Sequence, residues 1–157
     1  MDYQKLFLTF FYTGLSKKAP GTVGTLAGLL AGVVFLLFLP KNTLFAATLA
    51  ITIIAIFEIN KYEKKHDASD PKEIVIDEVA GIWLVLMMIP FDFVSILLGF
   101  VFFRIYDIFK PSIIGRVDKR LKGGLGVMLD DILAGFFAGI TVLVVLALYE
   151  KYLLPVL

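Results

Sequence analysis

The sequence contains no cysteine and a single histidine, His66. The absence of thiols excludes disulfide bonds, thiolate metal sites and enzymes with a cysteine nucleophile, and one histidine excludes mechanisms that need two. Neither charge sign is in excess, with 15 Lys and Arg against 14 Asp and Glu, so nothing indicates a nucleic-acid partner. Any catalysis must therefore depend on carboxylates, Lys, Arg and hydroxyl groups, with a metal ion as the expected supplement.

Apolar residues are in large excess. They make up 59% of the 157 residues, at a mean hydropathy of +0.90, whereas a soluble domain is roughly 45–50% apolar. A soluble bundle with an apolar core is the alternative, but runs such as LAGLLAGVVFLLFL show no polar stripe at helical spacing. The apolar runs cover residues 23–39, 44–59, 74–89, 93–109 and about 127–152, each close to the ~20 residues that span a membrane.

The sequence therefore predicts an all-α polytopic membrane helix bundle, with about five spans in a single domain over residues 1–157. The aromatic segment 3–13 is too short to span and is expected to form a helix on the membrane surface or against the bundle. Asp92 is expected to cap the helix that begins at Phe93. Lys and Arg concentrate before residue 20 and in segments 60–73 and 110–127, which five spans place on one side of the membrane. Only Lys41 and Lys151 fall on the opposite side. The positive-inside rule then places these segments in the cytoplasm and the C-terminus outside.

Five carboxylates lie in otherwise apolar segments, all near the predicted cytoplasmic boundary: Asp77, Glu78, Asp107, Asp130 and Asp131. A carboxylate at that depth is costly unless it is paired or metal-bound. Arg104 and Lys110 lie three residues on either side of Asp107 and offset only part of the repulsion. Because all candidate ligands are oxygens, the sequence predicts Mg²⁺ rather than Zn²⁺ at these five residues.

Other interpretations of these acids are open. Acids in the first turn of a helix favour the helix dipole, which explains four of them as caps but not Asp107, near a helix C-terminus. Carboxylates in a membrane also mark cation transporters and channels, although transport sites usually lie near the midplane. A catalytically inactive scaffold is a third possibility.

Two glycine-rich segments precede predicted helices. In residues 20–25, Thr22, Gly24 and Thr25 offer hydroxyls and backbone N–H groups to an anion; the alternatives are a flexible turn or close helix packing through Gly24 and Gly28. Residues 122–126 fit either a phosphate loop or a hinge. Arg116 and Lys122 fit contacts with anionic lipid head groups or plain solvated charges, and Asp118 fits an ion pair among these cations.

Four blocks carry a family resemblance: PGTVGTLAG (20–28), IVIDEVAGIW (74–83), FRIYDIFKPSIIGRVD (103–118) and GGLGVMLDDILAG (123–135). They resemble phosphatidylglycerophosphatase A. The resemblance implies a helical, Mg²⁺-dependent phosphatase that converts phosphatidylglycerophosphate to phosphatidylglycerol at the cytoplasmic face of the bacterial inner membrane. The chain departs from the family pattern at Tyr106 and Ser112. Position by position, the resemblance implicates Thr22, Thr25, Asp77, Glu78, Arg104, Asp107, Lys110, Asp118, Asp130 and Asp131.

We therefore expect phosphomonoester hydrolysis, by attack of water rather than through an aspartyl-phosphate. The expected catalytic residues are Asp77, Arg104, Asp107, Lys110 and Asp131. The expected substrate contacts are Thr22, Gly24, Thr25, Lys110, Arg116 and Lys122. Membrane lipids are the other expected partners, and the sequence leaves the oligomeric state, the number of ions and the acyl-chain preference open.

Overall fold

The computed structural model describes residues 2–67, 71–111 and 113–152, without the side chains of residues 118 and 119. Across this part of the chain the protein is helical and has no strand, which confirms the all-α prediction. The elements are α1 (Tyr3–Leu8), η1 (Thr13–Leu15), α2 (Pro20–Phe38), α3 (Lys41–His66), α4 (Ile76–Met88), α5 (Phe93–Phe109), α6 (Ile113–Arg120) and α7 (Gly123–Tyr152).

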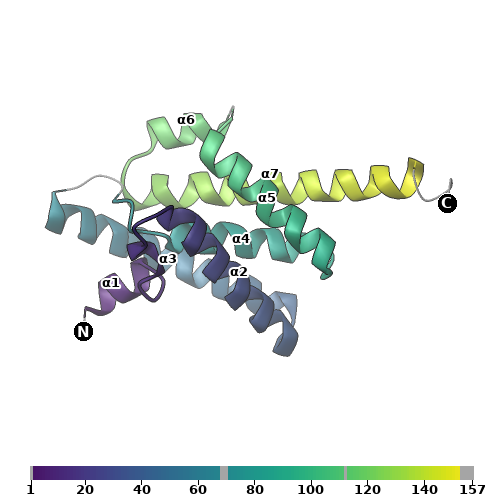
Figure 1. Cartoon of the computed structure of the whole chain (residues 1–157). Coiled ribbons are helices and arrows are strands. Elements are labelled where there is room, and N and C mark those ends of the chain that lie inside the picture. The colour runs from purple at the N-terminus through teal and green to yellow at the C-terminus, as the bar shows by residue number, and fades with distance from the viewer. Residues whose placement is uncertain (1, 68–70, 112, 153–157) are drawn as a thin grey trace.

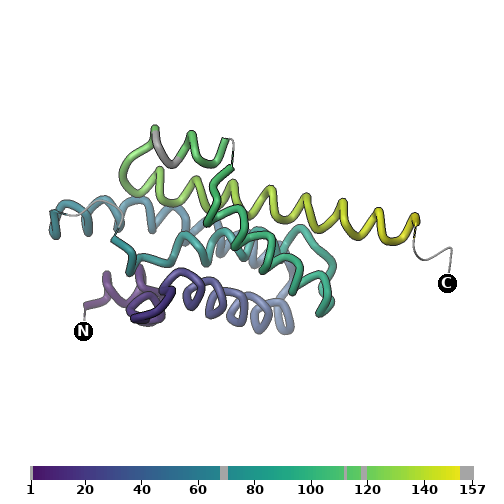
Figure 2. The backbone as a smooth tube through the Cα atoms, turned by 45° about the horizontal axis from the view of Figure 1, so that its top comes forward, coloured from purple at the N-terminus to yellow at the C-terminus, as the bar shows by residue number. Residues whose placement is uncertain are grey.

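The long helices pass back and forth between two ends of the bundle (Figure 1). The N-termini of α2, α4 and α7 and the C-termini of α3 and α5 lie toward one end, together with α1 and α6. We call this the polar end, because it carries the charged segments of the sequence. The C-terminal part of α7 extends beyond the other helices at the opposite end (Figure 2).

α4 is the central helix. It packs against α2, α3, α5 and α7, and residues on all its sides are buried, among them Ile76, Val79, Ile82 and Val85. A helix that is apolar all round is a buried helix. The apolarity of this segment therefore reflects contact with protein rather than with lipid.

The prediction of about five spans is confirmed only in part. Within the described part of the chain, three helices are long and apolar enough to cross a membrane: Pro20–Phe38, Lys41–His66 and Gly123–Tyr152. α4 has 13 residues and α5 has 17, which gives about 20 and 26 Å of helix against a hydrocarbon core of about 30 Å. The candidate spans carry exposed apolar side chains, such as Leu30, Phe57 and Leu148, as a lipid-facing surface requires.

Several element boundaries differ from the predicted ones. α3 continues through charged residues to His66, α7 begins at Gly123, and α6 lies inside the charged segment 110–127, which separated two predicted spans. Charged residues end an apolar run without ending the helix. Hydropathy therefore indicates where a segment would leave the membrane, but not where the helix ends. The predicted cap at Asp92 is confirmed, since its Oδ1 accepts a hydrogen bond from Ser95 N at 2.9 Å.

Glycines allow α4 to approach its neighbours closely. A Cβ on Gly28 of α2 would lie 2.9 Å from Val79, and one on Gly135 of α7 would lie 2.4 Å from the carbonyl oxygen of Gly81. At the same crossing, a Cβ on Gly81 would lie 2.7 Å from the carbonyl oxygen of Asp131. Small residues at such crossings let helix backbones meet, and this crossing holds Asp131 against α4.

Candidate active site

A cavity of about 390 Å³ opens at the polar end, where α2, α4 and α7 begin and where α3 and α5 end. Its charged lining residues are Glu63, Lys72, Asp77, Glu78, Asp107, Lys110, Lys122, Asp130 and Asp131. All five carboxylates singled out in the sequence therefore meet at one cavity, although they come from three helices. Charges of both signs surround a space large enough for a small polar ligand.

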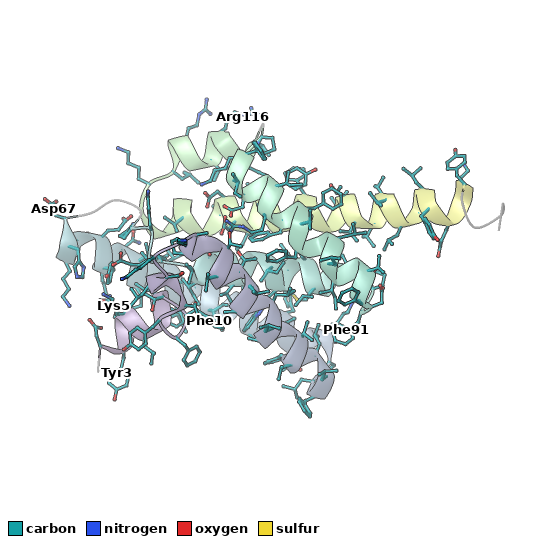
Figure 3. All side chains as sticks on the ribbon, viewed as in Figure 1. Tyr3, Lys5, Phe10, Asp67, Phe91 and Arg116 are labelled. Carbon is teal, nitrogen blue, oxygen red and sulfur yellow. The ribbon has the colours of Figure 1, made fainter. Side chains whose placement is uncertain are left out.

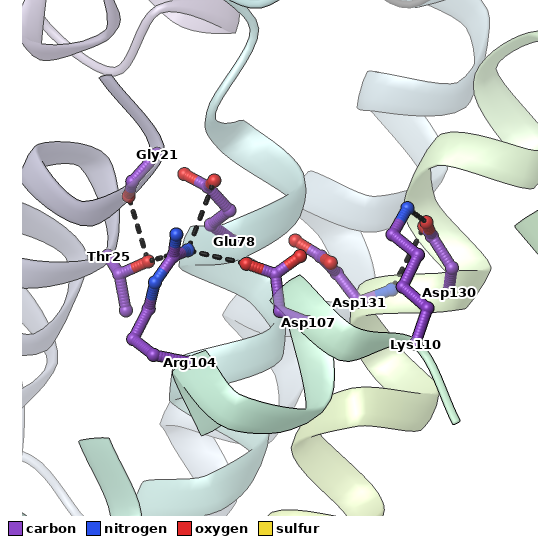
Figure 4. Close-up of polar contacts among 8 residues, drawn as sticks. All are labelled: Gly21, Thr25, Glu78, Arg104, Asp107, Lys110, Asp130 and Asp131. Carbon is purple, nitrogen blue, oxygen red and sulfur yellow. Dashed lines mark hydrogen bonds and ion pairs between the residues drawn. The ribbon is translucent and has the colours of Figure 1, made fainter. Parts of the chain in front are cut away.

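Arg104 organises one side of the cavity (Figure 4). Its Nη1 lies 2.5 Å from Asp107 Oδ2 and 3.3 Å from Glu78 Oε1. The same nitrogen donates a hydrogen bond to Thr25 Oγ1 at 3.1 Å, and the Thr25 hydroxyl donates to the Gly21 carbonyl at 2.9 Å. The guanidinium thus neutralises carboxylates from α4 and α5 and ties them to α2. This arrangement accounts for an acid near the C-terminus of α5, where the helix dipole disfavours one.

Lys110 organises the other side. It ends α5 in a left-handed conformation, with φ of 42°. Its ammonium group forms an ion pair with Asp130 Oδ2, while Asp130 Oδ1 accepts a hydrogen bond from Asp131 N at 3.0 Å. The sequence spacing led us to expect Lys110 to offset Asp107; the structure shows an ion pair of Lys110 with Asp130 of α7.

Asp131 lies between these two clusters and is only 3% exposed. Its Oδ2 has no hydrogen-bond partner among the residues that the structure describes. The charges of Asp107, Asp77 and Glu78 lie close enough to repel it. A buried carboxylate oxygen without a partner is costly, and a bound cation would remove that cost.

The donor chemistry around Asp131 suits a hard cation, because every candidate ligand is an oxygen. However, within residues 2–67, 71–111 and 113–152, no three acidic or histidine side chains are arranged so that they could hold an ion. The carboxylates line a cavity rather than enclose a point, and the side chains would have to turn to share an ion. The Mg²⁺ site therefore stays a prediction.

The predicted substrate contacts fall into two groups. Lys110 and Lys122 line the cavity. Thr25 is completely buried beneath Arg104, and Gly24 packs against α4, where a Cβ would lie 2.5 Å from Val75. Thr22 is half-buried on the first turns of α2.

Arg116, the remaining predicted contact, is exposed on α6 and points away from the bundle (Figure 3). The side chain of Asp118 lies outside the described residues.

Sequence reasoning missed the contribution of α3. Glu63 of α3 lines the cavity, as does Lys72 in the segment before α4. Asn60 Oδ1 of α3 accepts a hydrogen bond from Gly124 N at 2.9 Å, which caps the start of α7. A Cβ on Gly124 would lie 2.2 Å from the Ile56 carbonyl oxygen, so this glycine serves close packing. Continuing the helical spacing of residues 44–59 into the charged segment would have placed Asn60 and Glu63 on α3.

Comparison with known proteins gives consistent matches along almost the whole chain. The family model described as Phosphatidylglycerophosphatase A matches residues 6–146. The chain is 37% identical over 133 residues to phosphatidylglycerophosphatase A of Haemophilus influenzae, covering 84% of this chain and 82% of that protein. It is 36% identical over 126 residues to phosphatidylglycerophosphatase A of Escherichia coli, covering 80% and 73%.

A protein of Bacteroides thetaiotaomicron named "Putative phosphatidylinositol-3-phosphatase" is 34% identical over 143 residues, covering 87% of this chain and 89% of that protein. No solved structure matches the chain. The matched residues 6–146 include every residue that lines the charged cavity. The chain is therefore an enzyme of the phosphatidylglycerophosphatase A family, as the four sequence blocks predicted.

Proposed function

We propose that the protein hydrolyses the terminal phosphomonoester of phosphatidylglycerophosphate to phosphatidylglycerol and inorganic phosphate. Family membership supports the reaction. The single structural observation that carries the proposal is the cavity at the polar end, where carboxylates and lysines face the same space. A phosphomonoester with nearly two negative charges would meet Lys110 and Lys122 there.

The chain's own residues would bind and orient the head group. Lys110 and Lys122 attract the phosphate oxygens, and Arg104 keeps the carboxylates of Glu78 and Asp107 in place. In the hydrolysis, a bond forms between the water oxygen and phosphorus, the bond from phosphorus to the glycerol oxygen breaks, and a proton reaches that oxygen. Asp107 and Asp131 are the carboxylates that we place nearest the reacting phosphoryl group.

We propose Mg²⁺ as the cofactor, with Asp131 as its first candidate ligand and Asp77, Glu78, Asp107 and Asp130 as the other oxygen donors. When bound, the ion would neutralise charge on the phosphoryl oxygens and make a water molecule more acidic. The unpartnered Oδ2 of Asp131 supports this choice.

Phosphate release from purified protein tests reaction and cofactor together. We expect release from phosphatidylglycerophosphate with Mg²⁺, its loss with a chelator, and its return when Mg²⁺ is restored. Undiminished release in the chelator would contradict the cofactor, and no release under any condition would contradict the reaction. Hydrolysis in ¹⁸O-labelled water, with an attempt to trap a phospho-enzyme, distinguishes attack by water from an aspartyl-phosphate route.

A second substrate deserves a direct comparison because of the Bacteroides thetaiotaomicron relative. Phosphatidylinositol 3-phosphate also presents a phosphomonoester on a lipid head group. We expect a higher kcat/KM for phosphatidylglycerophosphate than for phosphatidylinositol 3-phosphate or phosphatidic acid. The reverse order would reassign the substrate within the same reaction class.

The polar end is proposed to face the cytoplasm of a bacterial inner membrane, on the evidence of its Lys-rich segments. The cysteine-free sequence allows a clean test with single cysteines. A cysteine at Arg120, on the polar end, should react with a membrane-impermeant maleimide only after cells are opened. A cysteine at Asn42, at the other end, should react in intact spheroplasts. The opposite pattern would invert the proposed orientation.

A further inference from the structure

A strained aromatic turn follows α1. Phe10, Phe11 and Tyr12 have φ of 41°, 57° and 66°, a left-handed conformation that is costly for residues other than glycine. The hydroxyl of Thr9 accepts a hydrogen bond from Tyr12 N at 3.1 Å, and the hydroxyl of Thr13 donates to the Phe10 carbonyl at 2.8 Å. The chain thus holds a strained backbone that leaves Phe11 70% exposed, and such strain often marks a functional segment.

Beside this turn lies a second cavity, which we call the apolar groove. It has a volume of about 320 Å³, within the range of sites for small ligands. α1 and the turn contribute Leu6, Phe7 and Phe10, α3 contributes Ile51, and α4 contributes Ile76 and Trp83. Tyr3 and Phe11 complete the lining and are the most exposed of its residues; Figure 3 shows Tyr3 and Phe10 on the side of α1.

The lining excludes a polar occupant. The indole N–H of Trp83 already donates to the Gly28 carbonyl at 2.8 Å, so the ring offers only apolar surface to the groove. The remaining lining residues are aliphatic or aromatic, and the Tyr3 hydroxyl is the only other polar side-chain group among them. A hydrocarbon chain is the ligand that such a lining suits.

The position of the groove identifies the source of that chain. α3 is one of the candidate spans, and Ile51 lies in the middle of its apolar part. Ile76 and Trp83 are two turns apart on α4, so the groove extends about 10 Å along that helix. Ile76 is followed by Asp77, which lines the charged cavity. The groove therefore starts at the level of the polar end and continues along the apolar helices, the same order as in a phospholipid.

We propose that the apolar groove binds one acyl chain of a phospholipid of the surrounding bilayer. The aromatic turn and Tyr3 then lie where the acyl chains meet the head groups, a depth that aromatic side chains favour. The bound chain fills a space that the protein's own side chains leave open next to Trp83. This proposal does not depend on the phosphatase reaction, so either can fail without the other.

Trp83 is the only tryptophan of the chain and reports directly on the groove. We would reconstitute the full chain in nanodiscs of phosphatidylcholine with ordinary or dibrominated acyl chains, since bromine quenches tryptophan on contact. We expect emission to fall by more than half with brominated lipid. Ile51→Phe, which fills the groove, should remove most of that quenching, whereas Ile53→Phe is a matched control because Ile53 is 49% exposed on the same helix.

Two outcomes would overturn the proposal. Absence of quenching in the wild-type protein would mean that something other than lipid, such as a second copy of the chain, covers Trp83. Equal quenching in the wild-type, Ile51→Phe and Ile53→Phe proteins would mean that lipid reaches Trp83 without entering the groove. Leu6→Phe fills the groove from α1 and keeps the test valid should Ile51→Phe lose its helical circular-dichroism signal.

Discussion

Arg104 Nη1 lies 2.5 Å from Asp107 Oδ2, and the two residues are one helical turn apart on α5. The same nitrogen also reaches Glu78 of α4 at 3.3 Å, and the side chains of all three residues are no more than 14% exposed. One cation therefore neutralises two carboxylates in a poorly solvated place. Removing it would leave both charges buried without this partner.

Arg104→Gln tests that relationship. We expect it to lower the free energy of unfolding by about 3–5 kcal/mol, the usual cost of leaving a buried charge without its partner. Thermal unfolding in detergent measures the effect. Arg120→Gln, an exposed position at the end of α6, should change little; similar midpoints for the two variants would show that Arg104 is not structurally important.

Thr25 is expected to act as a positioning residue, because it reaches the cavity only through Arg104. Thr25→Val keeps the shape of the side chain but removes its hydrogen bond to the guanidinium. We expect kcat to fall about tenfold with little change in KM, since a hydrogen bond to a charged group contributes about 1.5 kcal/mol. Thr25→Ser should restore kcat. A rise in KM instead would indicate direct contact with substrate, as the sequence first predicted.

Asp131→Asn tests the proposed ion without relying on turnover. If Mg²⁺ binds the folded wild-type protein, its addition raises the unfolding midpoint. At an Mg²⁺ concentration a hundredfold above Kd, the free energy of unfolding increases by about 2.7 kcal/mol. Asp131→Asn should abolish hydrolysis and most of that stabilisation while keeping the helical content. Asp67→Asn, which changes an exposed acid at the end of α3, should retain the full response. The same response in both variants would remove Asp131 from the proposed site.

The sequence predicted the helical class and the gathering of the acids better than it predicted the number of spans. Residues 74–89 read as a span because burial in protein and burial in lipid select the same apolar residues, whereas α5 has exposed apolar side chains and 17 residues. Only the packing shows that Ile82 and Val85 of α4 meet other helices rather than lipid. Hydropathy alone therefore could not separate the central helix from the candidate spans.

At the cavity, the sequence identified the carboxylates but not the pairing of the charges. Spacing along one helix linked Lys110 to Asp107, and the structure shows an ion pair of Lys110 with Asp130 on α7 that this spacing did not predict. This pair joins two different helices, and spacing along one helix does not encode such a contact. The role of Thr25 was hidden for a similar reason, because its partner Arg104 is distant in sequence.

The cap at Asp92 predicts a pH-dependent contribution to stability. Hydrogen bonds from the side chain and backbone of Ser95 lower the pKa of Asp92 below its ordinary value of 3.8. A lowered pKa in the folded state means that the carboxylate stabilises the fold above the ordinary pKa and loses this effect as pH falls through the lowered one. Asp92→Ala should therefore unfold more easily than wild type near neutral pH, and the difference should shrink in acid. A difference that does not depend on pH would contradict a role for the charged form.

The crossing of α4 and α7 gives the last prediction. A Cβ on Gly81 would lie 2.7 Å from the carbonyl oxygen of Asp131, and one on Gly135 would lie 2.4 Å from the carbonyl oxygen of Gly81. Alanine favours a helix over glycine by about 1 kcal/mol, but these contacts are with backbone that cannot turn aside. We therefore expect Gly135→Ala to be destabilising, by about 1–3 kcal/mol as for other overpacked sites.

Gly81→Ala tests whether this crossing affects hydrolysis in addition to the stability of the fold. The added methyl group would lie 2.5 Å from the Phe103 ring of α5 and 2.7 Å from the Asp131 carbonyl oxygen of α7. We expect the resulting shift to move Asp131 relative to Asp77, which lines the cavity from α4. Hydrolysis measured well below the unfolding temperature should fall even where the protein remains folded. Ala147→Val adds carbon to the exposed face of α7 and should leave hydrolysis unchanged. Full activity in folded Gly81→Ala would show that the cavity tolerates a change in helix spacing, and that the close crossing serves the fold alone.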